Sequence, residues 1–217
     1  MGGVGDVGDV GGVEASSRDA NRADAKRAEP DVAAVILAAG GGRRLGGRPK
    51  ALLAHGGELL VERAVRTARA GGCRQVVVVL GAEADEVRRR ADLDRCIVTV
   101  NQDWETGMGS SLRAGLAAVP GTCRAAVILL VDQPFVTSEA VRAVIASGAE
   151  VAAATYDGRR GHPVLIAARH WPEASAAAVA DRGARDFLAR HEVMVVPCEG
   201  SPADIDVPAD LMLLAPW

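Results

Sequence analysis

The fold of this chain is decided by V-A-A-V-I-L-A-A-G-G-G-R-R-L-G-G-R-P-K, the stretch from Val32 to Lys50. Its first part, Val32 to Leu37, is a continuous apolar run, which is the pattern of a strand buried on both faces of a sheet. The loop that follows is crowded with glycines and cationic side chains: Gly40, Gly41, Gly42, Gly46, Gly47, Arg43, Arg44, Arg48 and Lys50. Glycine lets backbone N–H groups approach a ligand closely, and such amides form an anion-binding concavity. We therefore predict a polyphosphate-binding loop.

Two common phosphate-binding motifs do not fit this loop. The pattern G-x-x-x-x-G-K-[ST] fails because Arg48 and Pro49 separate the lysine from Gly47, and Ala51 follows it. The dinucleotide pattern G-x-G-x-x-G fails by one position, because the last glycine stands at position 46. A different kind of nucleotide site is therefore expected.

The motif that does fit is L-A-A-G-x-x-x-R-x-G-x-x-P-K. It resembles the opening loop of the sugar-nucleotide and cofactor nucleotidyltransferases, and it is most similar to the MobA-like family in the branch with molybdenum cofactor cytidylyltransferase. The residues that carry it are Leu37, Ala38, Ala39, Gly40, Arg44, Gly46, Pro49 and Lys50. Gly42 stands where that branch often has a serine, so one hydroxyl contact to phosphate is absent.

Composition separately supports a specific role for Lys50. The chain has only two lysines, Lys26 and Lys50, among 25 Lys and Arg residues. The planar fork of arginine does not replace a compact ammonium where a point charge must lie between phosphate oxygens. We therefore predict that Lys50 acts on phosphates; the alternative is a solvated surface lysine without a function.

Bulk composition excludes several classes of protein. A hydrophobic content of 49% with 24% charged residues is ordinary for a globular protein. The net charge of -3 and the absence of a basic stripe argue against a nucleic-acid partner. The four cysteines form no C-x-x-C pair, so neither a thiolate metal site nor a disulfide framework is expected. No apolar run reaches the ~20 residues of a membrane span, and the N-terminus lacks a secretory pattern, so we expect a cytoplasmic protein without a membrane partner.

The chain divides near residue 30. Residues 1–30 consist mainly of Gly, Asp, Ala and Arg, with isolated valines, and cannot bury enough apolar area to offset their ordering entropy. We expect a disordered N-terminal tail over residues 1–30; a docking tail and a mis-assigned start codon are alternatives. The nucleotidyltransferase domain is expected over residues 31–217.

Apolar runs and helix-like segments alternate along that domain. The expected strands are 32–37, 75–80, 96–100, 125–131 and 150–155, and the expected helices are 59–70, 83–91, 110–119, 138–146 and 184–190. This alternation predicts an α/β fold with a mostly parallel sheet and helices on both faces. The resemblance implies the same class, a Rossmann-like three-layer α/β/α arrangement of the nucleotide-diphospho-sugar transferase type. In such sheets ligands bind at the carboxyl ends of the strands.

Two aspartates are candidate ligands of a divalent metal. Asp132 follows the apolar run from Ala125 to Val131, at the sheet edge where the glycine loop is expected. Mg²⁺ typically uses one or two protein carboxylates together with substrate phosphates. The segment V-D-Q-P resembles the family's metal-binding strand end, and D-I-D-V-P resembles its D-I-D-T-P ending, which implies Asp206 as the second ligand. The alternative is that both aspartates only cap turns or helices, whereas Asp210 is expected in the first turn of a closing helix.

The segment from Asn101 to Leu116 is expected to contact the base and ribose. Its S-L-x-x-G-L part resembles the family pattern, which implies Ser111 as a base contact; the alternative is that Ser110 and Ser111 cap the helix. The predicted nucleotide-binding set is Leu37, Ala38, Ala39, Gly40, Gly41, Gly42, Gly109 and Ser111.

Two further segments resemble acceptor-binding parts of the family. G-H-P places His162 in a G-x-P turn, and D-R-G-A-R implies that Arg185 holds an acceptor phosphate or caps a helix. Arg159 and Arg160 either meet an acceptor phosphate or form a solvated turn.

The resemblance implies a Mg²⁺-dependent cytidylyltransferase. An acceptor phosphate, with molybdopterin first among the acceptors, would attack the α-phosphorus of CTP and release pyrophosphate, with Lys50 and Arg44 as catalytic cations. A molybdoenzyme or its chaperone is an implied partner. Sugar phosphates and small phosphorylated acids are alternative acceptors. The alternatives from other classes are an NAD(P)-dependent oxidoreductase, since members of this branch carry that label, and a nucleotide-binding regulator without turnover.

Overall fold

Strand β1 (Val32–Leu37) is buried at every position, as the apolar run predicts. The structure is a computed structural model that describes residues 1–3 and 31–215. The prediction of a disordered tail therefore concerns a segment that lies almost wholly outside the described residues, and the domain boundaries stay predictions.

The described elements alternate between strands and helices. The other strands are β2 (Ala54–His55), β3 (Glu58–Leu59), β4 (Gln75–Leu80), β5 (Ile97–Val100), β6 (Ala125–Leu130), β7 (Val151–Tyr156), β8 (Arg159–Ala167) and β9 (Met194–Pro197). The α-helices are α2 (Leu60–Ala70), α3 (Ala84–Arg90), α4 (Met108–Ala118), α5 (Ser138–Ala146), α6 (Trp171–Ala177) and α7 (Arg185–Leu188). Short 3-10 helices are η1 (Arg43–Leu45), η2 (Lys50–Leu52), η3 (Trp104–Thr106), η4 (Ala168–His170), η5 (Ala180–Arg182) and η6 (Pro208–Leu214).

Seven of these strands form one sheet in the order β5-β4-β1-β6-β8-β7-β9, and β2 and β3 form a separate hairpin. Strands β1, β4, β5 and β6 pair in parallel, and β7 pairs with β9 in parallel. Within this sheet β8 is antiparallel to both of its neighbours, β6 and β7. The sheet is therefore mostly parallel, as predicted.

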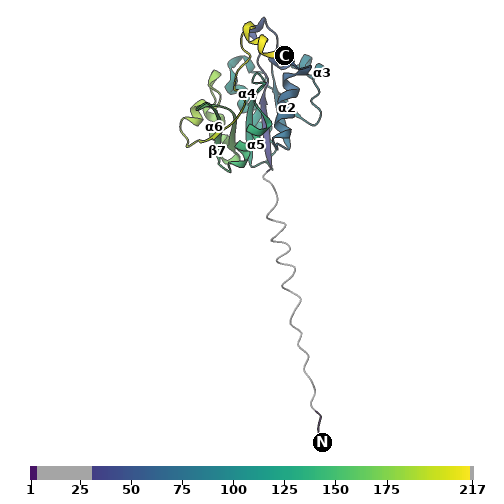
Figure 1. Ribbon diagram of the computed structural model, residues 1–217, viewed down its shortest axis with the longest axis vertical. Helices are drawn as coiled ribbons and strands as arrows, with labels where there is room; N and C mark the ends of the chain where they lie inside the picture. The colour runs from purple at the N-terminus through teal and green to yellow at the C-terminus, as the bar shows by residue number, and fades with distance from the viewer. Residues whose placement is uncertain (4–30, 216–217) are drawn as a thin grey trace. The chain divides into compact units, whose positions relative to one another are not determined.

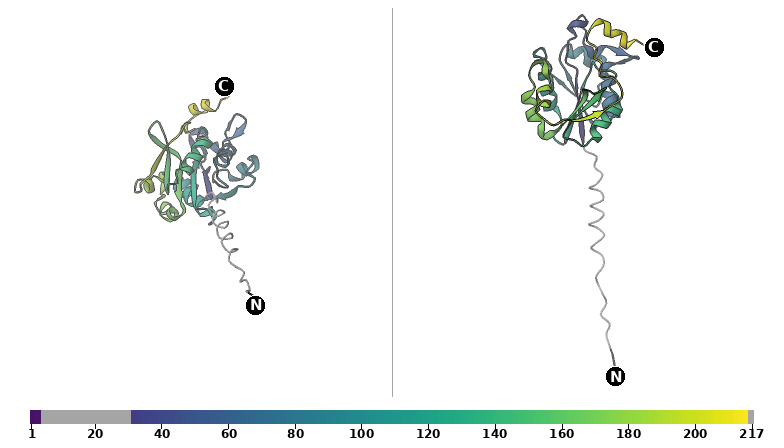
Figure 2. Two further views of the ribbon diagram at one scale, coloured as in Figure 1. Left: turned by 60° about the horizontal axis from the view of Figure 1, so that its bottom comes forward. Right: turned by 60° about the vertical axis from the view of Figure 1, so that its left-hand side comes forward.

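Helices cover both faces of the sheet (Figure 1, Figure 2). Side chains of β1 alternate between two cores, because successive residues of a strand point to opposite faces. Val32, Ala34 and Ile36 pack in the core under α2, α3 and α5. Ala33, Val35 and Leu37 pack in the core under α4, α6 and α7. The predicted three-layer α/β/α fold is thus confirmed.

Strand β8 corrects the prediction of a turn at G-H-P. Gly161, His162 and Pro163 lie inside β8, where the pairing with β7 is irregular between Ala153 and Thr155. The strand was not predicted because it contains Pro163. Proline cannot donate to a β ladder and is found in sheets at edges or bulges. The irregularity supplies that bulge and leaves these residues free of regular pairing. The prediction also omitted α6, β9 and the short strands β2 and β3.

The carboxyl ends of β1 and β6 lie side by side, since residues 32–37 pair in register with residues 125–130. The segment after β9 returns over this edge, where the Ile205 amide donates to the Asp132 carbonyl at 2.9 Å. The same segment then approaches the β2–β3 hairpin, where His55 Nδ1 lies 3.2 Å from the Leu214 carbonyl oxygen (Figure 2). The edge predicted for the ligand is therefore roofed by the C-terminal part of the chain.

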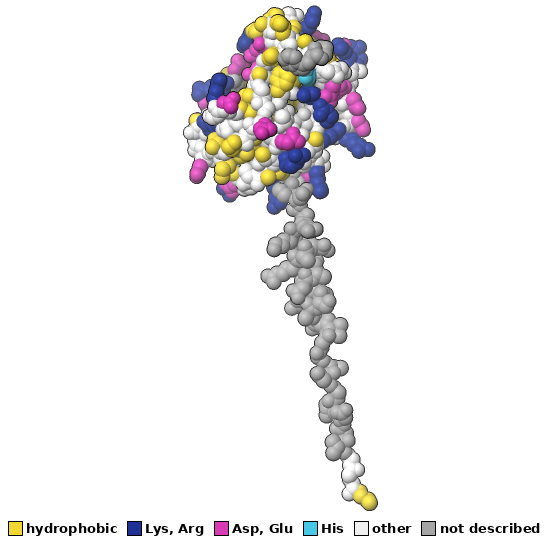
Figure 3. Space-filling view, viewed as in Figure 1, with side chains coloured by type: hydrophobic (Ala, Val, Ile, Leu, Met, Phe, Trp, Pro, Cys, Tyr) yellow, Lys and Arg dark blue, Asp and Glu magenta, His cyan; other side chains and the backbone are white. Residues whose placement is uncertain are grey.

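Two surface properties bear on partners. Among the described residues, no helix has both the length and the apolar character needed to cross a bilayer. On the face seen in Figure 3, basic and acidic side chains are interspersed, so that face has no continuous basic stripe of the kind nucleic acids use.

Gly115 is required where α4 crosses the sheet. A methyl group at this position would lie 2.4 Å from Val35 Cγ1 and 2.9 Å from Val79 Cγ2. We expect Gly115→Ala to lower the free energy of unfolding by about 1–3 kcal/mol through overpacking, although alanine is the better helix former by about 1 kcal/mol. Urea unfolding measures this. Exposed Ala117 is the control: Ala117→Gly should cost no more than about 1 kcal/mol, and a Gly115→Ala variant as stable as the parent would contradict the close contact.

Candidate active site

A cleft of about 1570 Å³ opens at the carboxyl edge of the sheet. Its walls come from the glycine loop after β1, the start of α4, the end of β6, the bulged part of β8, the region around α7 and residues 201–206. The predicted site residues that line it are Leu37, Ala39, Gly40, Gly41, Gly42, Arg44, Lys50, Ser111, Asp132, His162, Arg185 and Asp206. Tertiary structure therefore brings twelve of the fourteen predicted residues to one cleft.

Ala38 and Gly109 do not line the cleft. The Ala38 amide donates to the Val79 carbonyl at 2.9 Å and so extends the sheet. At Gly109 a side chain would lie 2.6 Å from the Ala178 carbonyl oxygen, so this glycine permits close packing of α4. Both residues shape the scaffold beside the cleft rather than its surface.

Gly42 fixes the shape of the glycine loop. It has a left-handed backbone (φ 60°), and its carbonyl accepts hydrogen bonds from the amides of Leu45 and Gly47 at 2.8 and 3.1 Å. A Cβ at this position would lie 1.9 Å from the Arg48 carbonyl oxygen. This turn therefore admits glycine only, which accounts for the missing serine.

Trp104 both lines the cleft and packs against the glycine loop. Its ring lies where a Cβ on Gly41 would approach to 3.1 Å. The indole thus packs against the glycine loop at Gly41 and exposes part of its surface to the cleft.

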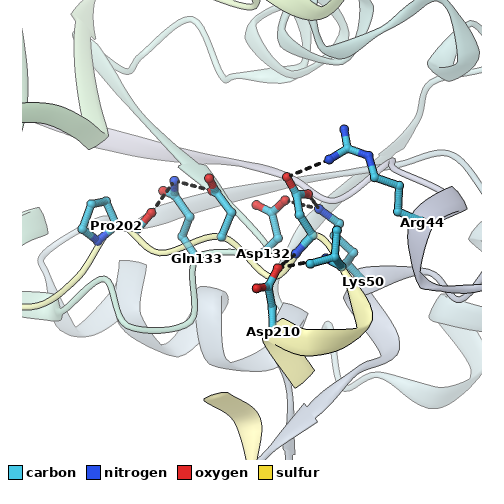
Figure 4. Close-up of polar contacts among 9 residues, drawn as sticks. Arg44, Lys50, Asp132, Gln133, Pro202 and Asp210 are labelled. Atoms are coloured by element: carbon cyan, nitrogen blue, oxygen red, sulfur yellow. Dashed lines mark hydrogen bonds and ion pairs between the residues drawn. The ribbon is translucent and has the colours of Figure 1, made fainter. Parts of the chain in front are cut away.

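A lysine and two aspartates meet at the centre of the cleft (Figure 4). Lys50 Nζ donates to Asp132 Oδ2 at 2.6 Å and also to Asp206 Oδ1. Arg44 Nη1 lies 3.4 Å from the other oxygen of Asp206. The three residues around Lys50 come from the glycine loop, the end of β6 and the C-terminal segment, so the contact joins three distant parts of the chain.

The charges in this cluster depend on one another. Partial burial disfavours the ammonium of Lys50, but the charges and hydrogen bonds of Asp132 and Asp206 outweigh it and raise the pKa of Lys50 above its ordinary value. Burial raises the pKa of Asp204, and the nearby charges of Asp132 and Asp206 raise it further, against the hydrogen bond from Gln133 at 2.8 Å. The site therefore holds more negative charge than Lys50 alone balances.

These residues fit a divalent metal. Two carboxylates from opposite walls converge on one point, where the ammonium of Lys50 stands in for a cation. The donors are carboxylate oxygens, which hard cations such as Mg²⁺ and Mn²⁺ prefer. A metal bound by Asp132 and Asp206 would lie beside the glycine loop, at the end where polyphosphate is expected.

Asp210 holds the backbone of the second aspartate. Its carboxylate accepts from the amides of Asp206 and Val207 at 2.8 and 2.9 Å, and these bonds lower the pKa of Asp210 (Figure 4). Asp210 lies in the first turn of η6, as the sequence predicted, so the predicted closing helix is confirmed as a 3-10 helix.

Ser110 and Ser111 form a buried polar network and do not cap α4, which begins after Gly107 without a side-chain cap. Asn101 Nδ2 donates to the hydroxyl oxygens of both serines, at 2.8 and 3.0 Å. Ser111 thus accepts from Asn101 and also lines the cleft. The alternative of two capping serines is therefore wrong.

The far end of the cleft is cationic. Arg159, Arg160 and Arg185 line it without an ion-pair partner among the described residues, whereas Arg182 is paired with Asp186 at 2.5 Å. His162 lies among them, and the Tyr156 hydroxyl donates to its carbonyl oxygen at 2.7 Å. Burial, together with the charge of Arg185, lowers the pKa of His162 to about 4, so the imidazole is neutral near pH 7. Guanidinium groups in such a setting bind phosphate oxygens.

Sequence reasoning missed three residues of the site. Asn101 and Gln133 stand in quoted segments but were given no role, Tyr156 stands in no motif, and the roles of all three arise from contacts across the fold. The one available signal is that Asn101 and Tyr156 stand at the carboxyl ends of strands, the edge where ligands bind in such sheets.

The fold and the cleft together define a nucleotidyltransferase of the Rossmann-like α/β/α class. Residues 34–195 match the family model described as the MobA-like NTP transferase domain, and the chain belongs to this family.

Three known proteins are similar to this chain. A protein named nicotine blue oxidoreductase, from Paenarthrobacter nicotinovorans, is 41% identical over 190 residues, which cover 82% of this chain and 93% of that protein. The crystal structure of a Mycobacterium tuberculosis Rv0371c homologue from Mycobacterium sp. strain JC1 has 33% identity and a TM-score of 0.77, covering 85% of this chain and 94% of that one. The structure of Rv0371c in complex with manganese has 30% identity and a TM-score of 0.74, covering 85% and 97%.

The neutral state of His162 has a consequence for stability. Its pKa of about 4 in the folded protein is below the ordinary 6.5, so the unfolded chain binds the proton more tightly. The contribution of His162 is complete above about pH 6.5 and is lost as the pH falls towards about 4. We expect the free energy of unfolding to fall less for His162→Gln than for the parent when the pH is lowered from about 7 to about 4.5, the range in which His162 of the unfolded chain takes up its proton. Urea unfolding at both values tests this; parallel losses would show that His162 titrates normally.

Proposed function

We propose that this nucleotidyltransferase transfers CMP from CTP to a phosphorylated acceptor, with molybdopterin as the favoured acceptor, in a reaction that depends on Mg²⁺. The observation that carries the proposal is the convergence of Lys50, Asp132 and Asp206 beside the glycine loop. In the reaction an oxygen of the acceptor phosphate attacks the α-phosphorus of the nucleotide. The bond from that phosphorus to the bridging oxygen breaks, and pyrophosphate leaves. The acceptor is already an anion, so no general base is required.

Each end of the cleft has a task in this proposal. Amides of Gly40, Gly41 and Gly42 bind the phosphates, while Lys50 and Arg44 neutralise the charge that develops on the leaving pyrophosphate. Asp132 and Asp206 would hold Mg²⁺, which supplies charge stabilisation to phosphate oxygens when bound. The manganese complex of Rv0371c supports a divalent metal in this family.

The base and ribose are assigned to the wall formed by Leu37, Ala39 and Ser111, which line the cleft next to the glycine loop. The hydroxyl of Ser111 accepts from Asn101 and would donate its hydrogen to a carbonyl oxygen or ring nitrogen of the base. CTP is preferred over GTP because this chain has L-A-A-G at residues 37–40. That sequence resembles the cytidylyl-transferring branch, whereas L-A-G-G is typical of the guanylyl-transferring one.

The acceptor is assigned to the cationic end. Arg185, Arg159 and Arg160 would bind its phosphate, and neutral His162 can both donate and accept a hydrogen bond there. The size of the cleft, about 1570 Å³, leaves room for an acceptor as large as a pterin beside a nucleotide. Sugar phosphates and small phosphorylated acids are the other acceptors to assay. A cytoplasmic location and delivery to a molybdoenzyme or its chaperone would follow from a molybdopterin product.

Lys50→Ala should lower the rate of pyrophosphate release from CTP by about 10²–10³, the usual cost of losing a charge that stabilises a transition state. Lys50→Arg should not restore the rate, because a planar fork cannot reproduce the point charge. Arg88→Ala, on the exposed surface of α3, is the control for the loss of a positive charge. Turnover of Lys50→Ala close to that of the parent would refute the assignment. Running the same assay with GTP and the other nucleotides tests the preference for CTP.

If Asp132 and Asp206 share one metal, Asp132→Asn and Asp206→Asn should each cripple turnover and raise the Mg²⁺ concentration needed for half-maximal rate. The double variant should be little worse than the worse single, because residues that act as a unit are not additive. Asp85→Asn on α3 is the matched control. Rates measured against Mg²⁺ concentration decide the matter. Additive losses without a change in the metal requirement would contradict a shared metal.

A second candidate function is an NAD(P)-dependent oxidoreductase, which the name of the Paenarthrobacter nicotinovorans relative favours. The glycine spacing does not match a dinucleotide loop, and hydride transfer gives no task to a lysine between two aspartates. The two functions separate in one assay: oxidation of a reduced nicotinamide that is indifferent to Asp132→Asn and Asp206→Asn would favour the oxidoreductase.

A further inference from the structure

A second group of metal-ligating side chains lies on the α6 side of the molecule, outside the cleft lining. His170, Glu173 and His191 each present one ligand atom, and these atoms all lie within 4.8 Å of one another. His170 immediately precedes α6 (labelled in Figure 1) and Glu173 lies in its first turn, so their spacing of three residues places them on one face. His191 follows the end of α7, which packs beside α6.

The tautomer of His191 is fixed by its surroundings. Its Nδ1 lies 2.9 Å from the Phe187 carbonyl oxygen, which can only accept, so Nδ1 carries a hydrogen. In the neutral ring Nε2 therefore presents its lone pair, and it lies 3.2 Å from Glu173 Oε2. A lone pair facing a carboxylate oxygen repels it unless a proton or a metal ion lies between the two. A backbone carbonyl holding the other ring nitrogen is the usual arrangement of a metal-ligating histidine.

Packing holds both imidazoles in place. The side chains of His170 and His191 are 18% and 19% exposed, and their rings lie nearly perpendicular with centroids 5.1 Å apart. The Phe187 ring packs 4.0 Å from that of His191. Little side-chain entropy therefore remains to be lost when a ligand binds.

Glu173 is the carboxylate available to a cation. Its side chain is 49% exposed, so an ion can reach it from solvent. Glu150 approaches His170 Nε2 at 3.4 Å but is paired with Arg169. Arg169 Nε donates to the same His170 nitrogen at 3.2 Å, so an ion bound at Nε2 would replace this hydrogen bond. The group thus combines two imidazoles with one half-exposed carboxylate.

We propose that His170, Glu173 and His191 form a Zn²⁺ site, with water as the fourth ligand. Two nitrogens and one oxygen suit zinc and other borderline transition ions, whereas Mg²⁺ prefers an all-oxygen set. The ion would join the start of α6 to the end of α7. Because Arg185 of α7 lines the cleft, the site would also steady the acceptor end.

The test uses the full chain, stripped with a chelator and titrated with Zn²⁺ in a calorimeter. We expect one Zn²⁺ per chain and a melting temperature that rises on binding. His170→Ala, Glu173→Gln and His191→Asn should each weaken binding by at least about 100-fold, since even supporting residues of metal sites cost 10–100-fold. Co²⁺ in place of Zn²⁺ should give the intense visible bands of a four-coordinate ion in the parent only.

The variants are chosen so that loss of folding cannot imitate loss of the site. The amide of His191→Asn can still donate to the Phe187 carbonyl, and Glu173→Gln alters a half-exposed side chain; melting in the presence of chelator checks both. Glu192→Gln is the control for a neighbouring charge, and Asp132→Asn shows whether the ion binds in the cleft instead. Absence of stoichiometric binding, or binding that survives His170→Ala and His191→Asn, would overturn the proposal.

Discussion

The repulsion between Asp132 and Asp206 is the constraint on which this site depends. Two carboxylates from opposite walls of a cleft can stay close only if a cation lies between them. Lys50 supplies that cation, and in doing so it ties the glycine loop to the end of β6 and to the C-terminal segment. The charges that join the walls of the cleft are therefore the same ones that the proposed chemistry uses.

In the proposed function, the ammonium of Lys50 and a divalent metal would compete for the same place between the two carboxylates. A nucleotide brings phosphate oxygens that can accept Lys50, which would release both carboxylates to a metal. Once Lys50 moves to phosphate, the two carboxylates repel each other and favour a divalent cation between them. Polyphosphate and metal are thus expected to bind together rather than independently.

The scaffold places each wall by ordinary packing. Parallel strands bring the loop after β1 and the end of β6 to one edge, and the bulge in β8 turns His162 into the same cleft. Two glycines matter for distinct reasons: Gly42 because its turn excludes a side chain, and Gly115 because α4 lies close against the sheet. The core needs few aromatic rings, since Ala, Val, Leu and Ile fill it on both faces of the sheet.

Sequence alone determined the parts that local pattern encodes. The apolar run before the glycines predicted both ends of β1 correctly. The alternation of apolar and helix-like segments predicted the three-layer class. Lys50, Asp132 and Asp206 could be named because each lies in a short motif. Strand β8 could not be predicted, because Pro163 argues against a strand until it is known to lie in a bulge. Asn101, and the pairing of His191 with Glu173, also depended on tertiary structure, since the partners of a polar side chain lie far along the chain and only folding brings them within hydrogen-bonding distance.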